Sequence, residues 1–284
     1  MDKLSFVIKS MFDRISVRYD FMNRFLTCGL DIYWRKVFVK RTLASFIKLS
    51  GANNSNNNNN NNNSNNSNGN GNNINIADIA SGTGDIAIEI YNRLKSDKIT
   101  NSFFAGKTVH ICCIDFSMPM LKIAQEKIGK LMSRANGNNS DNNITFSFVI
   151  CDAQNSCFKD SVFDIIFIAF GLRNFSDIKK FISVELKRIV NKNLSFSAIL
   201  EFNNIFKVKN FKFFQFYYNH FITLCASIFS TDSSAYKYLV DSIKNLPQDR
   251  VILKIFTDEG FKIFNYRKIF PYLVSRYIAI INNS

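Results

Sequence analysis

The amino-acid sequence predicts an α/β fold, a doubly wound and mostly parallel sheet of seven strands preceded by a helical N-terminal extension. After residue 73, apolar β-type runs alternate with helical patterns, and the run FDIIFIAFG is apolar almost without a break. Repeated strand then helix is typical of a parallel sheet covered on both faces, and an unbroken apolar run is typical of a strand buried on both faces. With 284 residues, the chain is long enough to form this core as one domain, 1–284.

The elements follow in order along the chain. Residues 1–50 are expected to form a helical lid. The expected strands cover 74–80, 108–115, 144–151, 162–169, 194–202, 261–270 and 272–281. The expected helices cover 85–94, 119–132, 177–190 and 235–259, and Ser176 is a plausible N-cap for the third of them.

Three segments fall outside this alternation. Residues 53–73 are almost entirely Asn with a few Ser and Gly, so they have no apolar surface to bury and are expected to be a disordered insert. Residues 136–143 repeat this composition on a smaller scale. Residues 203–235 are rich in aromatic side chains, with lysines near the start, and an amphipathic core helix explains most of that pattern.

Composition excludes several classes of protein. The formal net charge is +14, from 36 Lys and Arg against 22 Asp and Glu, but the cations are scattered, and no basic helix or stacking motif predicts nucleic-acid binding. None of the six cysteines forms a C-x-x-C pair, so reduced thiols and no metal site are expected. Neither a secretory signal nor a membrane-spanning helix is expected.

The first strand runs into a glycine-rich turn, Ser81-Gly82-Thr83-Gly84, which leads directly into a helix. Such a turn lets the backbone approach a ligand closely, at the edge of the sheet where ligands of doubly wound folds bind. The letters GTGDIA also fit the G-x-G-x-x-A dinucleotide pattern, so the turn alone does not identify the ligand.

Acidic side chains at the ends of neighbouring strands indicate which kind of ligand binds at the glycine turn. Asp115 ends the second strand, where its carboxylate could accept hydrogen bonds from both hydroxyls of a ribose, and Asp78 and Asp85 flank the glycine turn. These acids would repel a pyrophosphate and suit a cationic ligand with a free ribose, such as S-adenosylmethionine. Asp152 and Ala153, after the third strand, could accept from the adenine amino group and lie beside its ring.

At this point the sequence resembles the ubiquinone and menaquinone biosynthesis C-methyltransferases, a family of class I S-adenosylmethionine-dependent methyltransferases with a Rossmann-like fold. The resemblance covers nearly the whole chain outside the Asn-rich insert. It is carried by FDRISVRYDFMNRFLTCGLDIYWR (12–35), ADIASGTGD (77–85), IDFSMPML (114–121), IAFGLRN (168–174), LEFN (200–203) and YKYLVDSIKNLP (236–247). The segments YDFMN and FGLRN separate this family from methyltransferases at large.

The resemblance implies roles for particular residues. Cofactor contacts are implied at Thr83, Asp115, Asp152 and Ala153, and also at Ala169, where many relatives have a serine, so that only backbone atoms are available there. Arg173 and Asn174 are implied as the catalytic pair, which would stabilise a phenolate or orient a water that removes the ring proton. Tyr19, Met22 and Asn23 are expected to close the substrate pocket.

The reaction implied is methylation of a ring carbon of a polyprenylated benzoquinol in ubiquinone biosynthesis, and the resemblance is strongest to the eukaryotic mitochondrial branch. It implies a location on the matrix face of the inner membrane, peripheral membrane contact, a quinone-biosynthesis protein complex and compatibility with a homodimer. Two alternatives stay open: a demethylmenaquinol methyltransferase, and a methyltransferase-fold subunit with a mainly structural role in such a complex.

Overall fold

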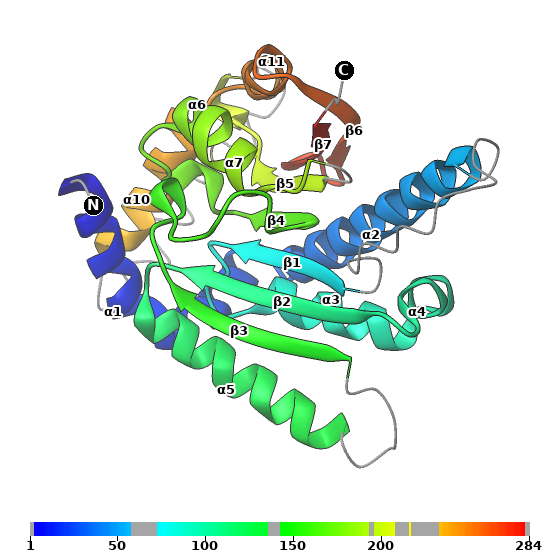
Figure 1. Ribbon diagram of the computed structural model, residues 1–284. Coiled ribbons are helices and arrows are strands. Elements are labelled where there is room, and N and C mark those ends of the chain that lie inside the picture. The colour runs from blue at the N-terminus through cyan, green and yellow to red at the C-terminus, as the bar shows by residue number, and fades with distance from the viewer. Residues whose placement is uncertain are drawn as a thin grey trace.

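The computed structural model describes residues 3–57, 73–135, 143–192, 196–207, 216 and 233–281. Its centre is a seven-stranded sheet in the order β3-β2-β1-β4-β5-β7-β6 (Figure 1). Strand β7 runs antiparallel to the six other strands, which are parallel to one another. The strands are β1 Asn73–Ile79, β2 Thr108–Asp115, β3 Ile144–Ile150, β4 Ile165–Ala169, β5 Phe196–Phe202, β6 Phe261–Ile269 and β7 Val274–Ile281. This is the class I methyltransferase arrangement, so the predicted fold class is confirmed.

Helices cover both faces of the sheet. The longer ones are α1 Lys3–Leu26, α2 Leu30–Asn57, α3 Asp85–Ser96, α4 Lys98–Phe104, α5 Met118–Ala135, α10 Ser233–Asn245 and α11 Asp249–Asp258. One further helical segment is continuous through α6 Ile178–Lys180, the π-helical turn η3 Phe181–Leu186 and α7 Lys187–Ile189. Short 3₁₀ turns are η1 Ala153–Asn155, η2 Leu172–Asn174 and η4 Ile205–Lys207. None of the described helices is both long and apolar enough to cross a membrane.

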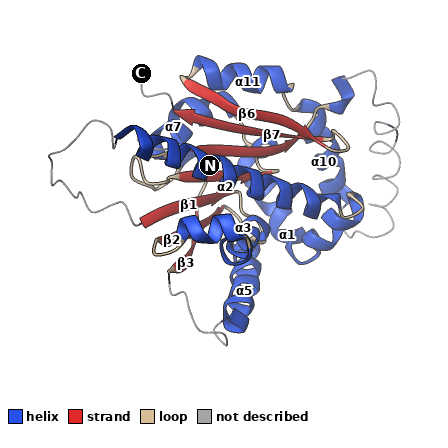
Figure 2. Ribbon diagram, turned by 90° about the vertical axis from the view of Figure 1, so that its right-hand side faces the viewer, coloured by secondary structure: helices blue, strands red, loops and turns tan. Residues whose placement is uncertain are grey.

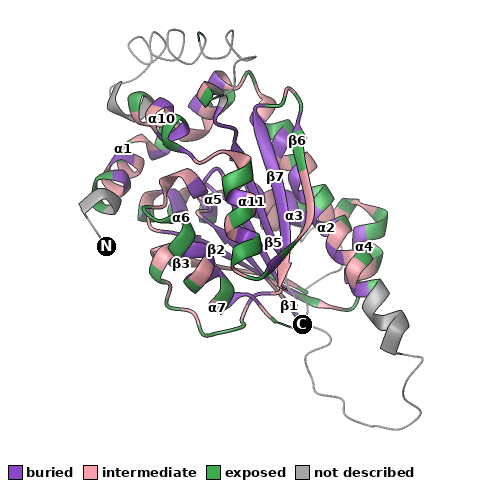
Figure 3. Cartoon of the chain, turned by 90° about the horizontal axis from the view of Figure 1, so that it is seen from above, coloured by how far each residue is buried: buried purple, intermediate pink, exposed green. Residues whose placement is uncertain are grey.

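The strands at the centre of the sheet are buried on both faces, as Figure 3 shows. In β4, Ile165 and Phe167 join the core beneath α2 and α3, while Ile166 and Ile168 join the core beneath η3 and α11. This alternation is the period of two that a strand imposes, so the apolar run FDIIFIAFG fills both cores. Edge-to-face packing of Phe38 on Phe167, with centroids 5.5 Å apart, ties α2 to the sheet.

The N-terminal helices lie across the sheet. Residues Thr27–Gly29 form the turn between α1 and α2, in which Cys28 and Gly29 have φ of 50° and 77°. Trp34 on α2 donates from Nε1 to the carbonyl of Phe270, 2.8 Å away, which joins α2 to the turn between β6 and β7. In Figure 2, α1 and α2 run along the same side of the sheet as α3.

Several element boundaries differ from the sequence prediction. The expected helix 235–259 is two helices, because Pro247 cannot continue α10 and the chain turns before α11. Asp177, and not Ser176, caps α6 by accepting from Lys180 N at 2.8 Å, while the hydroxyl of Ser176 donates to Gln154. The short helix α4 was not predicted.

The Asn-rich insert and the aromatic segment lie largely outside the described residues. Helix α2 continues to Asn57, and Asn73 already pairs with Thr108 in the sheet, so 58–72 is the part of the insert that the structure does not describe. Of the aromatic-rich segment 203–235, the described parts are 203–207, 216 and the start of α10.

A glycine at the end of β4 tests this packing. A Cβ added to Gly171 would lie 2.6 Å from the Cβ of Ala80, so the loops after β1 and β4 would have to separate. We expect Gly171→Ala to lower the free energy of unfolding by about 1–3 kcal/mol, the usual cost of overpacking. Urea denaturation without ligand measures this change.

The matched control is Gly129→Ala in α5, where an added Cβ meets nothing within 4 Å. It should raise the free energy of unfolding by up to about 1 kcal/mol, because alanine favours helix. Equal stability changes in the two variants would contradict the close contact at Gly171.

Candidate functional site

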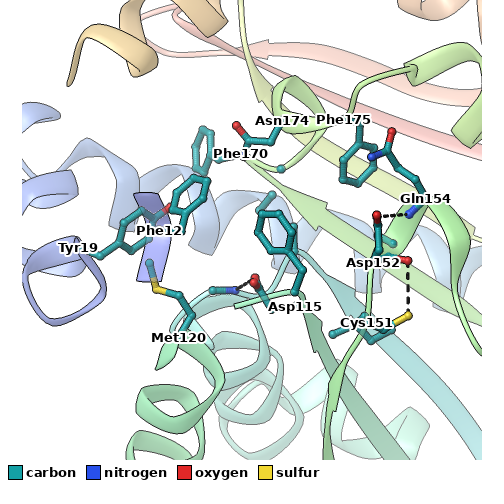
Figure 4. Close-up of a pocket in the computed structure, with 17 residues that line it drawn as sticks. Phe12, Tyr19, Asp115, Met120, Cys151, Asp152, Gln154, Phe170, Asn174 and Phe175 are labelled. Carbon is teal, nitrogen blue, oxygen red and sulfur yellow. Dashed lines mark hydrogen bonds between the residues drawn. The ribbon is translucent and has the colours of Figure 1, made fainter. Parts of the chain in front are cut away.

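A pocket of about 660 Å³ lies at the carboxyl edge of the parallel strands, where the ends of β1 to β4 meet. We call it the edge pocket. Figure 4 shows Asp115, Asp152, Phe170 and Asn174 from the sheet edge, and Phe12 and Tyr19 from α1, around one hollow. Its wall also includes Ala80, Gly82, Ile114, Phe116, Met120, Cys151, Ala153, Gln154, Ala169, Gly171 and Phe175.

The glycine turn borders the edge pocket through Gly82. Gly82 and Gly84 have φ of 53° and 82°, a left-handed conformation that glycine adopts without strain. Gly82 lines the pocket, whereas a Cβ on Gly84 would lie 3.0 Å from the Cβ of Ala124 on α5. The first glycine therefore exposes backbone to the pocket, and the second allows helix α5 to pack closely.

Asp115 holds the glycine turn against β2. Its carboxylate accepts from Gly82 N at 2.8 Å and from Ser117 N at 2.9 Å. Burial raises the pKa of Asp115 to about 6, although these backbone donors oppose the shift. Each carboxylate oxygen has a further lone pair, so Asp115 can still accept hydrogen bonds from a ligand.

Asp152 and Ala153 extend the same wall beyond Asp115. The Asp152 carboxylate caps the turn η1 by accepting from Gln154 N at 3.0 Å. Both residues line the edge pocket, as the sequence placed them, and Ala169 lines its opposite side.

The other acids near the glycine turn do not reach the pocket wall. Asp78 lies beneath the turn, accepts from Ala87 N at 3.2 Å, and has its pKa raised by burial to about 8. Burial alone would raise the pKa of Asp85, but Arg35 and Lys127 outweigh it and lower the pKa overall. The acidic lining predicted from sequence is thus reduced to Asp115 and Asp152.

Thr83 does not face the edge pocket either. Its hydroxyl donates to Asp20 on α1 at 2.6 Å, and Lys127 on α5 donates to the same Asp20 at 2.9 Å. A second contact joins α1 to the sheet edge, because Ser117 donates to Asp13 at 2.5 Å. These two contacts, which we call the lid anchors, hold α1 across the pocket.

Ser81 is also placed differently from the prediction. Its side chain is buried and does not line the edge pocket, and within the described part of the chain its hydroxyl has no hydrogen-bond partner.

A second pocket of about 440 Å³ adjoins the first, and we call it the side pocket. Tyr19 and Phe170 line both pockets, so they form the shared wall. Phe170 has φ of 58°, an unusual conformation for an aromatic residue, which costs on the order of 1–3 kcal/mol. Its ring packs on Phe202, with centroids 4.9 Å apart, and under the guanidinium of Arg35. The remaining lining residues are Asn23, Leu26, Thr27, Asp31, Arg35, Arg173, Phe202 and Leu239.

Arg173 lies in the wall of the side pocket with only 6% of its side chain exposed. Its Nη1 donates to Glu201 at 3.0 Å and to the carbonyl of Phe170 at 2.5 Å. Its Nε is buried and has no hydrogen-bond partner in the described part of the molecule. Arg173 is therefore a cation fixed through Nη1, and neither Nε nor Nη2 has a hydrogen-bond partner among the described residues, unlike the surface ion pair that an isolated arginine would suggest.

Asn174 follows Arg173 in the turn η2 and lines the edge pocket. Its Oδ1 accepts from the hydroxyl of Tyr238 on α10 at 3.1 Å. The predicted catalytic pair is therefore divided, with Arg173 in the side pocket and Asn174 in the edge pocket.

The predicted substrate residues on α1 separate in the same way. Tyr19 lines both pockets and Asn23 lines the side pocket, because residues four apart share one helix face. Met22 lies on the neighbouring face, is buried in the core and lines neither pocket.

Sequence reasoning missed several residues of the site. Phe12 and Phe170 gave no signal, since an aromatic side chain in an apolar pattern predicts core. Asp20 and Glu201 both lie in segments quoted for the resemblance, and an acid inside the apolar strand ILEF is a signal that we could have used.

Comparisons with known proteins agree with one another. The family model described as "ubiE/COQ5 methyltransferase family" matches residues 2–280. A "Demethylmenaquinone methyltransferase" of Porphyromonas gingivalis is 27% identical over 96% of this chain and 92% of its own. Two proteins of Geotalea are described as "Ubiquinone/menaquinone biosynthesis C-methyltransferase UbiE". That of Geotalea uraniireducens is 29% identical and that of Geotalea daltonii 31% identical, each over 90% of this chain and 88% of its own.

The pKa of Asp115 gives a testable pH dependence. Ribose hydroxyls donate to the ionised carboxylate, so the affinity for S-adenosylmethionine should rise as the pH rises through about 6 and level off above it. Asp115→Asn should weaken binding by about 10- to 100-fold, since a hydrogen bond to a charged group contributes about 1.5–3 kcal/mol. Titration calorimetry across this pH range measures both effects. An unchanged pH dependence in Asp115→Asn would count against the assignment.

The lid anchors predict a kinetic effect. Asp20→Ala removes the partner of Thr83 and one partner of Lys127, so α1 should open more readily. We expect S-adenosylmethionine to dissociate about tenfold faster, which corresponds to about 1.4 kcal/mol. Stopped-flow displacement measures the rate, with Asp258→Ala, an exposed partner of Lys254 on α11, as the control. Equal dissociation rates in the Asp20 variant and the wild type would show that the anchor does not hold the lid.

Proposed function

This chain belongs to the ubiE/COQ5 methyltransferase family, and on that premise we propose that it methylates a ring carbon of a polyprenylated benzoquinol in ubiquinone biosynthesis. It is an S-adenosylmethionine-dependent C-methyltransferase of ubiquinone and menaquinone biosynthesis. The choice of a benzoquinol ring, and the residue roles given below, are our proposal.

The edge pocket has the chemistry that S-adenosylmethionine requires. Asp115 would accept from the ribose hydroxyls, Asp152 from the adenine amino group, and Gly82 would present backbone to the ligand. When bound, the cofactor supplies an electrophilic methyl group on a cationic sulfur.

The single observation that supports the acceptor site best is Arg173. A ring carbon is a weak nucleophile unless a phenol oxygen on the same ring carries negative charge. The guanidinium of Arg173, which lines the side pocket and keeps N–H groups without a partner, can donate to such an oxygen there, where low polarity strengthens the interaction. Tyr19 and Phe170 would hold the ring flat against the shared wall.

The methylated carbon must then lose its proton. Among the described residues no histidine serves as the base, because His110 pairs with Thr145 and Ser147 on the sheet. Arg173 and Asn174 also border a more open groove of about 1150 Å³ beside Tyr238. Water entering from this groove can accept the proton while the two side chains orient it.

Further assignments rest on the resemblance and are proposed with it. We place the enzyme on the matrix face of the mitochondrial inner membrane, in peripheral contact with the bilayer and with a quinone-biosynthesis complex, and a homodimer is compatible with the fold. A demethylmenaquinol acceptor is the second candidate, because relatives with either name match this chain over similar lengths.

The test is methyl transfer from S-adenosylmethionine to a reduced short-tail methoxy-benzoquinol and to a reduced short-tail demethylnaphthoquinol, detected by mass spectrometry. We expect the benzoquinol to be methylated. Arg173→Ala should lower kcat about 10²- to 10³-fold, because it removes a charged donor from the reacting oxygen. Arg93→Ala, which breaks an ion pair with Glu89 on α3, is the matched control and should keep wild-type activity.

Methylation of the naphthoquinol alone would replace our proposal with the second candidate. A wild-type kcat in Arg173→Ala would contradict the proposed mechanism with either acceptor.

A further inference from the structure

The group that fixes Arg173 is a carboxylate that the proposed mechanism does not use. Glu201 lies near the end of β5 and is 0% exposed. It is an acid inside a strand whose other six residues are all buried. A buried carboxylate without partners is strongly unfavourable, so its contacts show what it does in the fold.

Glu201 accepts three hydrogen bonds. Oε1 accepts from Arg173 Nη1 at 3.0 Å and from Phe202 N at 2.9 Å, and Oε2 accepts from Arg173 N at 3.1 Å. Two of these three donors belong to Arg173, one from its side chain and one from its backbone. Glu201 lines none of the edge pocket, the side pocket or the open groove, so it is poorly placed to act as a base.

The contacts leave Arg173 little freedom. Nη1 is held by Glu201 and by the carbonyl of Phe170, and the guanidinium carbon lies 5.3 Å from the centre of the Phe202 ring. Nε and Nη2 have no hydrogen-bond partner among the described residues, and Arg173 lines the side pocket. The carboxylate therefore fixes where the guanidinium lies in the pocket wall.

We propose that Glu201 is a positioning residue, which clamps the backbone and side chain of Arg173 so that the N–H groups of its guanidinium that make no other hydrogen bond are available to an oxygen of the acceptor ring. The inference rests on the proposed function, because it assigns Glu201 a part in the same reaction. Glu201 acts only through Arg173 and does not touch the acceptor.

A residue that acts only through another has a defined signature. Removing Glu201 should lower kcat when Arg173 is present and change kcat little when Arg173 is absent. The double-mutant cycle of Arg173→Gln, Glu201→Gln and the variant with both changes tests this directly. Glu201→Gln keeps the size of the side chain, but it removes the charge and places an amide N–H₂ among three donors.

We expect Glu201→Gln to lower kcat about 10²-fold, the effect of misplacing a reacting group by a small distance. In the Arg173→Gln background the same change should alter kcat by no more than about twofold. The dissociation constant of S-adenosylmethionine should stay within about twofold in all the variants, since Glu201 lies outside the edge pocket. That constant, with the thermal melting curve, shows whether each variant is folded.

The matched control is Glu185→Gln. Glu185 is also a buried partner of an arginine, and it accepts from Arg188 Nη2 at 2.7 Å and from Ser156 N at 3.0 Å. Neither pocket nor the open groove includes it, so its substitution should leave kcat unchanged. If Glu201→Gln does not fold, Glu201→Asp replaces it in the cycle, because this change keeps the charge and shortens its reach.

A probe of simpler chemistry separates this inference from the proposed function. The 4-nitrophenolate anion has a phenol oxygen and absorbs visible light, so its binding is measured without methyl transfer. If the wild-type protein methylates neither quinol, the proposed function fails, and the same cycle of dissociation constants for 4-nitrophenolate tests the clamp.

Two results would overturn the inference. One is a wild-type kcat, or wild-type affinity for 4-nitrophenolate, in Glu201→Gln. The other is an equal loss of kcat, or of affinity for 4-nitrophenolate, from Glu201→Gln in the presence and in the absence of Arg173. That result would mean that Glu201 acts independently of Arg173.

Discussion

The parallel pairing of β1 with β2 and with β4 is the constraint on which the rest of the site depends. In this register Ile79 pairs with Ile114 on one side and with Ile168 on the other, so three strand ends stop together. Segments far apart in the sequence therefore meet at one edge. Each of these strands ends at part of the site: the glycine turn after β1, Asp115 at the end of β2, and the Phe170–Asn174 turn after β4. The pairing of the strands is enough to make these parts neighbours.

The sheet edge alone forms an open surface, and helix α1 turns it into pockets. Phe12 and Tyr19 project from α1 into the edge pocket, and Tyr19 with Phe170 separates this pocket from the side pocket. The lid anchors at Asp13 and Asp20 fasten the helix to loops of the sheet edge. In the proposed arrangement the cofactor occupies the edge pocket and the acceptor the side pocket, and the two meet beside Tyr19 and Phe170, because methyl transfer requires direct contact between the methyl group and the ring carbon.

Much of this could be predicted from sequence, because some features are local. The unbroken apolar run of β4, the glycine turn and the acid that ends β2 can each be recognised from a few consecutive residues. These local features gave the fold class, and they placed Asp115, Asp152 and Arg173 at the edge of the sheet.

The features that sequence missed depend on partners that lie far away in the chain. The side chain of Thr83 lies away from the pocket because its hydroxyl donates a hydrogen bond to Asp20, 63 residues earlier in the chain. Met22 faces the core because the face of α1 that carries Tyr19 and Asn23 lies over the pockets. Glu201 is one letter in an apolar run until Arg173, 28 residues away, is seen to donate to it.

The central claim is that the two pockets hold the two reactants, which meet beside Tyr19 and Phe170. A crystal structure with S-adenosylhomocysteine tests it most directly: the account predicts the ribose on Asp115 and the sulfur facing the shared wall, and a sulfur facing away from Phe170 and Arg173 would contradict it.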